Sequence, residues 1–239
     1  MIKYACVTGA DRGLGFEMVK ALIKKGYHVF AGHYLQSWKL LEALKIEDPD
    51  QLDIIELDVS SDISVKKAAS QIKSLTSSLE IIINNSAITG DNVSQFGDEL
   101  NYDEMLKVIN VNAIGSIRVV NELYALLKAG QKKWVINISS EAGSIGSCYR
   151  KGWFAYCTSK ASMNMLSSIV HNNLKAIGGQ VIIMHPGWMK TWLSGSYHDE
   201  GPLTPDIPAK KIIDMIESLN HPIEDHPLYI DYEGNQLQF

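Results

Sequence analysis

Short runs rich in valine and isoleucine recur along the chain, and segments with a helical pattern separate them. The runs lie at residues 2–7, 27–33, 53–59, 79–83, 133–138, 180–184 and 228–231. The helical patterns lie between Leu14 and Gly26 and at residues 37–46, 62–75, 102–129 and 153–177. Uniformly apolar runs of this length are typical of strands buried on both faces. Their alternation with helices predicts an α/β fold: a doubly wound parallel sheet of about seven strands, with helices on both faces.

The composition is that of an ordinary globular protein. The chain has 239 residues, of which 46% are hydrophobic and 21% are charged, and no linker, repeat or low-complexity tract divides it. We therefore expect a single domain over residues 1–239. The segment 192–208 is interrupted by glycine and proline and lacks periodicity. It is expected to form a small substrate flap.

Charge and cysteine content argue against several classes of protein. The net charge is −5 and lysine and arginine do not cluster, so a nucleic-acid surface is not expected. No apolar stretch reaches the ~18 residues of a membrane span, and the first strand begins too early to leave room for a signal peptide. The cysteines are odd in number and lack CxxC spacing. The sequence thus predicts no disulfide framework, no metal site and a cytoplasmic location.

A glycine-rich turn, TGADRGLG, joins the first strand to the first helix. Gly9, Gly13 and Gly15 lie in this turn, with Leu14 between the last two. Glycines at such a junction let the backbone approach a pyrophosphate, and the helix N-terminus supplies N–H groups and partial positive charge. The turn indicates a Rossmann-type dinucleotide site. The spacing is TGxxxGxG and not GxGxxG, and a glycine turn without a ligand is the alternative.

Polar residues mark the ends of four later strands. These ends read Leu57-Asp58-Val59, Asn84-Asn85-Ser86-Ala87, Ser139-Ser140 and His185-Pro186-Gly187. In an open α/β sheet, ligands bind beyond the carboxyl ends of the strands. Each residue alone is a common turn former, but the series predicts one binding edge.

The stretch YCTSK provides the candidate for proton transfer. Tyr156 and Lys160 are four residues apart and share one helix face. A phenol with a pKa of about 10 must lose roughly three units, or about 4 kcal/mol, to exchange protons near neutrality. One ammonium about 4 Å away at an effective dielectric of about 20 supplies roughly that much. A pair of surface residues is the alternative.

These motifs occur in one order: TGxxxGxG, an acid after the third strand, an NN turn, N-x-x-G, SS, YxxxK and PG. This order resembles the short-chain dehydrogenase/reductase family over nearly the whole chain. The stretch HPGWMKT and the ending IDYEGNQLQF further resemble the carbonyl-reductase-like branch that contains sniffer and C-factor proteins.

The resemblance implies a role for each matching position. Tyr156 would donate or accept the proton, Lys160 would lower its pKa and bind the nicotinamide ribose, and Ser140 would bind the substrate carbonyl. Asn112 would fix a water in a proton relay to Lys160. The other matches would hold the cofactor: Gly9, Gly13, Leu14 and Gly15 at the pyrophosphate, Asp58 and Val59 at the adenine, Asn84 on the adenine-ribose side, and Pro186, Gly187 and Thr191 near the nicotinamide.

The choice of cofactor depends on Arg12 and on the end of the second strand. NAD-binding Rossmann folds carry a carboxylate there, but this chain has His33 and Tyr34. The second basic residue that the family has at the position of Tyr34 is also absent. Arg12 beside the adenosine ribose favours NADP(H). NAD(H), with Arg12 stacked on the adenine, is the alternative.

Two departures from the family pattern affect the site. The usual NNAG reads NNSA, with Ala87 in place of glycine, which predicts a shifted turn. The interval between Ser140 and Tyr156 is longer than is common. Five aromatic residues are expected either to form an apolar substrate wall or to pack in the core or in a dimer contact: Tyr149, Trp153, Phe154, Trp188 and Trp192.

We therefore expect an oxidoreductase that transfers a hydride between nicotinamide and a small carbonyl or alcohol, with NADPH-dependent carbonyl reduction favoured. A dinucleotide-sensing regulatory protein with little turnover is the alternative, and the chain is short for a related isomerase or lyase. The helices at 102–129 and 153–177 are apolar on more than one face, and the resemblance implies a homodimer. The apolar residues of the second helix include Met163, Met165, Leu166 and Ile169.

Overall fold

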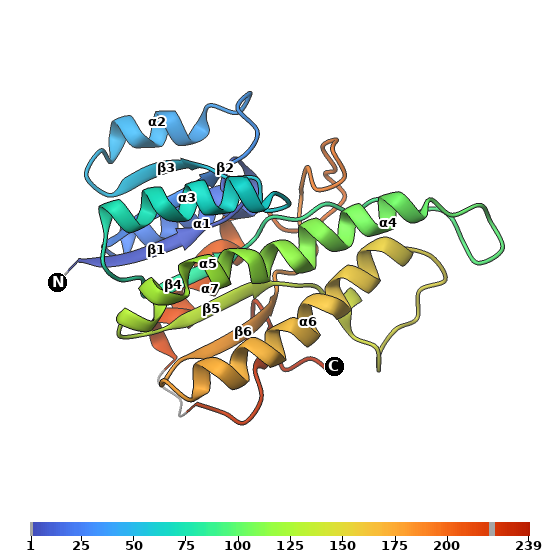
Figure 1. The fold of residues 1–239 in the computed structure, drawn as a ribbon. Coiled ribbons are helices and arrows are strands. Elements are labelled where there is room, and N and C mark those ends of the chain that lie inside the picture. The colour runs from blue at the N-terminus through green and yellow to red at the C-terminus, as the bar shows by residue number, and fades with distance from the viewer. Residues whose placement is uncertain (1, 220–222) are drawn as a thin grey trace.

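The computed structural model describes residues 2–219 and 223–239, and its centre is a seven-stranded sheet (Figure 1). The strands are β1 (Lys3–Val7), β2 (Tyr27–His33), β3 (Leu52–Glu56), β4 (Ile81–Asn84), β5 (Trp134–Ile138), β6 (Gln180–His185) and β7 (Leu228–Asp231). All neighbouring strands are parallel, in the order β3-β2-β1-β4-β5-β6-β7. The expected fold class is thereby confirmed, and each expected run overlaps one of the seven strands.

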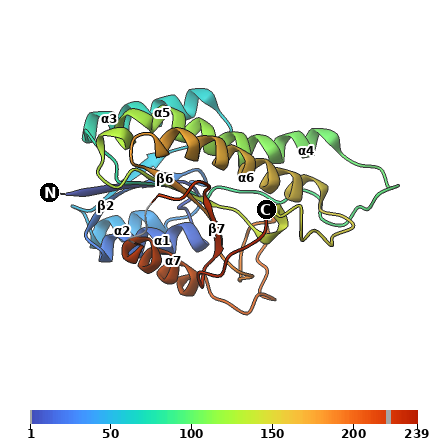
Figure 2. The same cartoon turned by 90° about the horizontal axis from the view of Figure 1, so that it is seen from below.

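Helices cover both faces of the sheet (Figure 2). They are α1 (Gly13–Lys24), α2 (Leu40–Glu47), α3 (Asp62–Leu75), α4 (Tyr102–Ile109), α5 (Gly115–Ala129), α6 (Phe154–Lys175) and α7 (Asp206–Ser218). In the view of Figure 2, α1, α2 and α7 lie below the sheet and α3 to α6 lie above it. This two-layer covering explains why the strands are apolar on both sides.

The core consists of two apolar clusters, one on each face of the sheet. Val7 and Ile83 belong to the cluster under α1 and α7, and their chain neighbours Cys6 and Ile82 belong to the cluster under α3 and α5. Successive side chains of a strand point to opposite faces, so each central strand contributes to both clusters. Because all neighbouring strands are parallel, the carboxyl ends of the strands lie at one edge of the sheet.

Two elements differ from the sequence-based expectation. The expected helix 102–129 is divided by a π-helical turn at Asn110–Ile114. The helix α7 was not expected, and it takes the last three residues of the segment 192–208. Pro205 is its N-cap residue and Pro208 lies in its first turn. The first turn tolerates proline because its N–H groups have no partner within the helix.

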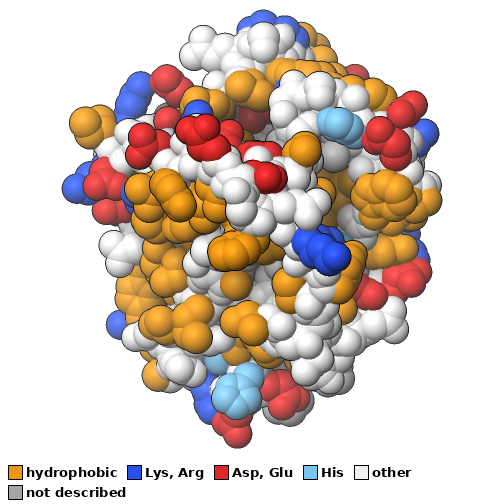
Figure 3. All heavy atoms as spheres, turned by 90° about the vertical axis from the view of Figure 1, so that its right-hand side faces the viewer, with side chains coloured by type: hydrophobic (Ala, Val, Ile, Leu, Met, Phe, Trp, Pro, Cys, Tyr) orange, Lys and Arg blue, Asp and Glu red, His pale blue; other side chains and the backbone are white. Residues whose placement is uncertain are grey.

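The carboxyl ends of the strands lie at the right of Figure 1, and Figure 3 faces that side. The strand order reverses between β1 and β4, which is where ligands bind in open α/β sheets. Hydrophobic side chains gather on this face in Figure 3. Exposed members in the loops beyond the strands are Phe96, Ile145, Tyr149 and Trp188.

Candidate active site

The turn between β1 and α1 is shaped for a negatively charged ligand. Gly9 and Gly13 have φ values of +60° and +56°, and a Cβ on Gly15 would lie 2.2 Å from the Gly9 carbonyl oxygen. The N-cap residue Arg12 makes no side-chain capping bond, and the first turn of α1 has no acidic residue. The first N–H groups of the helix are therefore available to an anion. The residues present fit a dinucleotide pyrophosphate.

Side chains from β1 and from the turn after β4 hold this glycine turn in place. The Thr8 hydroxyl accepts from the N–H groups of Asn85 and Ser86, at 3.0 and 3.1 Å. The Asn85 side chain donates to the carbonyls of Thr8 and Gly9, at 3.1 and 2.8 Å. Ala87 does not have a positive φ, so the loss of glycine there strains nothing. Sequence reasoning missed the supporting roles of Thr8 and Asn85.

A carboxylate lies beside the loop that follows β2, although the end of β2 itself carries none. Asp11 Oδ1 accepts from the N–H groups of Tyr34 and Leu35, at 2.8 and 2.7 Å. It also lies 3.5 Å from His33 Nε2. Sequence reasoning searched for an acid only after β2 and missed Asp11, which reaches the same loop from the glycine turn.

Arg12 projects from the glycine turn into a group of aromatic residues. Its guanidinium carbon lies 4.8 Å from the Trp38 ring centroid and 5.9 Å from that of Trp192. Its Nη2 donates to the Trp192 carbonyl at 3.3 Å, and Trp192 packs on Tyr197 at 4.3 Å between centroids. Trp192 thus links the segment after β6 to the glycine turn.

The expected adenine-side residues follow β3 and β4. Asp58 Oδ1 accepts from the N–H and hydroxyl of Ser60, at 2.9 and 2.6 Å. Val59 is buried, and a Cβ on Gly115 would approach its Cγ2 to 2.9 Å. Asn84 Nδ2 donates to Asn137 Oδ1 at 2.8 Å. Within residues 2–219 and 223–239, no donor reaches the buried Asn84 Oδ1.

The residues after β6 form a bend and a small hairpin. Gly187, next to Pro186, has a φ of +81° and a Cβ there would lie 2.8 Å from the Tyr232 ring. The Thr191 N–H donates to the His198 carbonyl at 2.9 Å. The Thr191 hydroxyl accepts from the Leu193 N–H at 3.2 Å.

Tyr156 and Lys160 lie on α6 and are both buried, with 7% and 1% of their surface exposed. Lys160 Nζ donates to the Ile138 carbonyl at the end of β5, at 2.7 Å. It lies 5.5 Å from the Tyr156 ring centroid. Trp153, directly before α6, packs edge-on against Tyr156 at 5.8 Å between centroids. Tyr156 and Lys160 therefore lie inside the protein, so the alternative that they are a pair of surface residues is wrong.

Burial dominates the protonation of this pair. Burial raises the pKa of Tyr156, and the charge of Glu141 raises it further, while the Ser140 hydroxyl acts in the opposite direction. Burial also lowers the pKa of Lys160 to about 7. The expected lowering of the Tyr156 pKa is not found, because the burial of Tyr156 itself and the charge of Glu141 outweigh the groups that lower the pKa.

Ser140 lies at the end of β5 beside a carboxylate. Its hydroxyl donates to Glu141 Oε2 at 2.6 Å and accepts from the Ala142 N–H at 3.2 Å. Its carbonyl accepts from the Tyr229 hydroxyl of β7 at 2.5 Å. Arg150 pairs with Glu141 Oε1. Sequence reasoning missed the Glu141–Arg150 pair. Both residues lie in the long interval between Ser140 and Tyr156, and the length of this interval was the one signal of it in the sequence.

Asn112 lies in the π-helical turn and is fully buried. Its Oδ1 accepts from the Ile88 N–H at 2.9 Å, and its Nδ2 donates to the Ile88 carbonyl at 2.8 Å and to Ser159 Oγ at 2.9 Å. It therefore ties the loop after β4 to α6, next to Lys160. A π-helical turn is frequent at functional sites.

The five aromatic residues expected as a wall divide into separate groups. Trp153 contacts Tyr156, and Arg150 lies over the rings of Tyr149 and Trp153, at 4.9 and 5.5 Å from their centroids. Phe154 is half-buried, Trp188 is exposed, and Trp192 packs at Arg12. Of the five, Trp153 is the one that packs against a candidate catalytic side chain.

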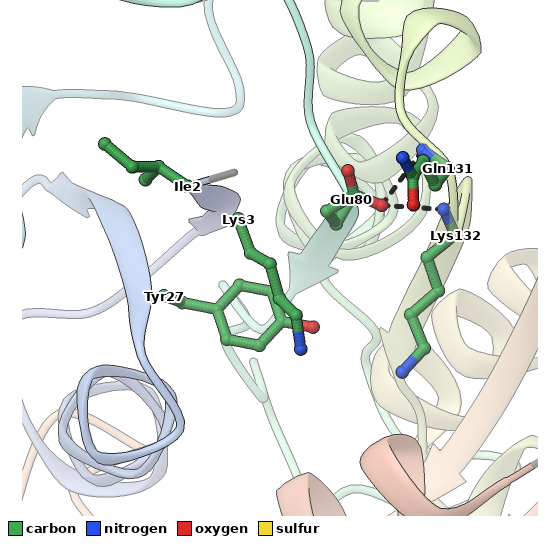
Figure 4. A pocket seen from close by; sticks show the side chains of 6 residues that line it. All are labelled: Ile2, Lys3, Tyr27, Glu80, Gln131 and Lys132. Atoms are coloured by element: carbon green, nitrogen blue, oxygen red, sulfur yellow. Dashed lines mark hydrogen bonds between the residues drawn. The ribbon is translucent and has the colours of Figure 1, made fainter.

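A cavity lies at the opposite edge of the sheet, where the strands begin (Figure 4). Its lining residues are Ile2, Lys3, Tyr27, Glu80, Gln131 and Lys132. Glu80 Oε2 accepts from the N–H groups of Gln131 and Lys132, at 3.0 and 2.7 Å. None of the expected catalytic or cofactor residues lines this cavity.

Comparisons with known proteins identify the family of the chain. Residues 3–201 match the family model of the short chain dehydrogenases. An uncharacterized oxidoreductase of Schizosaccharomyces pombe is 28% identical over 98% of this chain and 96% of its own length. An NADPH-bound carbonyl reductase from chicken fatty liver has a TM-score of 0.88 and 28% identity, covering 100% of this chain and 94% of its own. The carbonyl reductase Sniffer of D. melanogaster has a TM-score of 0.89 and 25% identity, with 100% of both chains covered.

The family model alone spans most of the chain, and the structural relatives include carbonyl reductases. The resemblance inferred from the motifs is confirmed. The chain belongs to the short-chain dehydrogenase/reductase family of oxidoreductases, which bind a nicotinamide dinucleotide, and it is similar to the carbonyl-reductase-like branch.

Proposed function

We propose that this protein reduces a carbonyl group of a small molecule with NADPH. One observation carries the proposal: Ser140, Tyr156 and Lys160 meet at the same sheet edge as the glycine turn. The similarity to an NADPH-bound carbonyl reductase supports it.

In this mechanism, the substrate oxygen binds between the hydroxyls of Ser140 and Tyr156. Bound nicotinamide supplies the hydride and, once oxidised, a positive charge. Tyr156 donates its proton to the oxygen as negative charge develops there. Lys160, with a pKa of about 7, can both hold and release a proton close to Tyr156 near neutral pH. Asn112 and Ser159 position the segment of α6 that carries both residues.

Two residues act in opposite directions on the choice of cofactor. Arg12 supplies a cation for the 2′-phosphate, whereas the neighbouring Asp11 supplies a negative charge. Asp11 Oδ1 is occupied by two backbone N–H groups, which favours Arg12 as the group presented to the ligand. We therefore propose NADP(H), with NAD(H) as the weaker cofactor.

Oxidation of NADPH measured across aldehydes, ketones and diketones tests the activity. Tyr156→Phe removes the proton donor and should lower turnover at least the roughly hundredfold typical of a lost general acid, with cofactor binding intact. Tyr4→Phe is the control, because Tyr4 stacks on Phe30 of the neighbouring strand β2 and lies outside the site. Cofactor binding without turnover of any carbonyl or alcohol would support the dinucleotide-sensing alternative instead.

The assembly and location that we propose rest on surface features. Met165 and Ile169 of α6 are 65% and 52% exposed, as is Leu106 of α4 at 64%, whereas Met163 belongs to the core. We propose that this face pairs in a homodimer, so Ile169→Glu should give a monomer by light scattering; a monomeric wild type at micromolar concentration would contradict this.

No described helix has the length and apolar character of a membrane span, and a cytoplasmic location stays a prediction.

A further inference from the structure

Glu141 places a carboxylate next to the hydroxyl that would bind the substrate oxygen. Both of its oxygens have partners: Oε2 accepts from Ser140 at 2.6 Å, and Oε1 accepts from Arg150. His185 Nδ1 lies 3.6 Å from Oε2, beyond hydrogen-bond distance. Neither the family pattern nor the proposed reaction requires a carboxylate here.

The Ser140 hydroxyl has only one hydrogen, and Glu141 holds it. A substrate carbonyl can accept from Ser140 only if the hydroxyl turns away from Glu141. Glu141 Oε2 would then lose its donor in a half-buried position, where the Glu141 side chain is 37% exposed. A hydrogen bond to a charged group is worth roughly ten- to a hundredfold in affinity. A simple ketone must overcome that loss.

The charged groups around Glu141 show which substrate group would replace the lost donor. Arg150 already neutralises the carboxylate, and Tyr156, Cys157 and Tyr229 face it from α6 and β7 as further ionisable groups. Burial lowers the pKa of His185, although the charges of Glu141 and Asp231 act in the opposite direction. A second cation would be repelled by Arg150, so the vacancy at Oε2 suits a neutral hydroxyl. That hydroxyl must lie beside the carbonyl, because Ser140 and Glu141 are adjacent.

We propose that the site prefers carbonyl compounds that carry a hydroxyl on the neighbouring carbon, and the proposal rests on the function proposed above. The carbonyl oxygen accepts from Ser140 and Tyr156, while the neighbouring hydroxyl donates to Glu141 Oε2. The carbonyl carbon takes a hydride from the reduced nicotinamide, and the oxygen takes the proton of Tyr156. The products are a vicinal diol and the oxidised cofactor, and the neighbouring hydroxyl is unchanged.

Three matched ketones test the preference: acetophenone, α-hydroxyacetophenone and α-methoxyacetophenone. The methoxy compound activates the carbonyl as the hydroxy compound does but has no hydrogen to donate. The kcat/KM for the hydroxy compound should exceed that for the methoxy compound at least tenfold. In Glu141→Gln this ratio should fall toward one, because the charged acceptor is lost. Glu56→Gln, whose exposed carboxylate pairs with Lys67 at the edge strand β3, four strand positions away from β5, should keep the wild-type ratio.

A wild-type ratio near one overturns the preference, whether or not Glu141→Gln folds. A high ratio that survives in folded Glu141→Gln overturns the role of Glu141. If acetophenone and the methoxy compound are reduced as fast as the hydroxy compound, the proposed carbonyl reduction stands and only the preference fails. Reduction of none of the three and of no other carbonyl contradicts both proposals.

Discussion

The burial of Lys160 should make the stability of the protein depend on pH in a specific window. Its pKa is about 7 in the folded protein, against an ordinary value of 10.5. Between these values the unfolded chain binds more protons than the folded protein, so stability rises as pH rises. Below pH 7 both states hold the proton and above 10.5 both release it, and this contribution is flat there.

The size of the effect follows from the same pKa values. One pH unit within the window corresponds to about 1.4 kcal/mol. Half of the folded molecules still hold the proton at pH 7, so raising the pH from 7 to 9 should add about 2 kcal/mol to the free energy of unfolding. Lys160→Met removes the group and its pH dependence. It also leaves the Ile138 carbonyl without this donor, at a cost of about 1 kcal/mol at every pH.

Urea unfolding of wild type and Lys160→Met at pH 7, 8 and 9 measures the difference. The free energy of unfolding of the variant, minus that of the wild type, should be largest at pH 7. This difference should be about 2 kcal/mol smaller at pH 9. Lys66→Met is the control, because Lys66 is exposed on α3. If the free energy of unfolding changes with pH in the same way in wild type and Lys160→Met, the argument that burial lowers the pKa of Lys160 is refuted.

The remaining predictions concern the cofactor end of the site. Arg12→Ala should weaken NADPH binding roughly ten- to a hundredfold and leave NADH almost unchanged, as measured by kcat/KM for both cofactors; equal losses would mean that Arg12 only packs on the adenine. Asp11→Asn keeps an acceptor for the N–H groups of Tyr34 and Leu35 but removes the charge beside Arg12, so it should raise the preference for NADPH, and a shift toward NADH would contradict our assignment of Asp11. His33→Asp should shift the preference toward NADH by repelling the 2′-phosphate, and an unchanged ratio would place the phosphate elsewhere. Gly15→Ala puts a Cβ 2.2 Å from the Gly9 carbonyl oxygen, so calorimetric titration should show that dinucleotide binding is lost; wild-type affinity would contradict the fit of the turn.

The strands could be predicted from the sequence because a parallel sheet covered on both faces needs uniformly apolar runs. The same logic failed at α7, where Pro205 and Pro208 resemble a loop although the first turn of a helix accepts them. The π-helical turn at Asn110–Ile114 could not be predicted either. It inserts into a continuous helical pattern without changing the residue types.

In the candidate site, residues within short motifs could be predicted from the sequence, whereas contacts between distant segments could not. Motif spacing identified Tyr156, Lys160 and Ser140, because each lies in a short stretch of characteristic sequence. Asp11 and Glu141 were missed, since their importance depends on partners in other loops. The pKa of Tyr156 was also misjudged, because spacing gives the distance to Lys160 but not the burial of both groups.

The hydrogen bond from Tyr229 to the Ser140 carbonyl has a consequence for the order in which the site can form during synthesis. The glycine turn is held by Thr8 and Asn85, which leave the ribosome early. The support beneath Ser140 comes from a residue 89 positions later in the chain. Because a domain generally folds as a unit, the support beneath Ser140 cannot form until nearly the whole chain has left the ribosome.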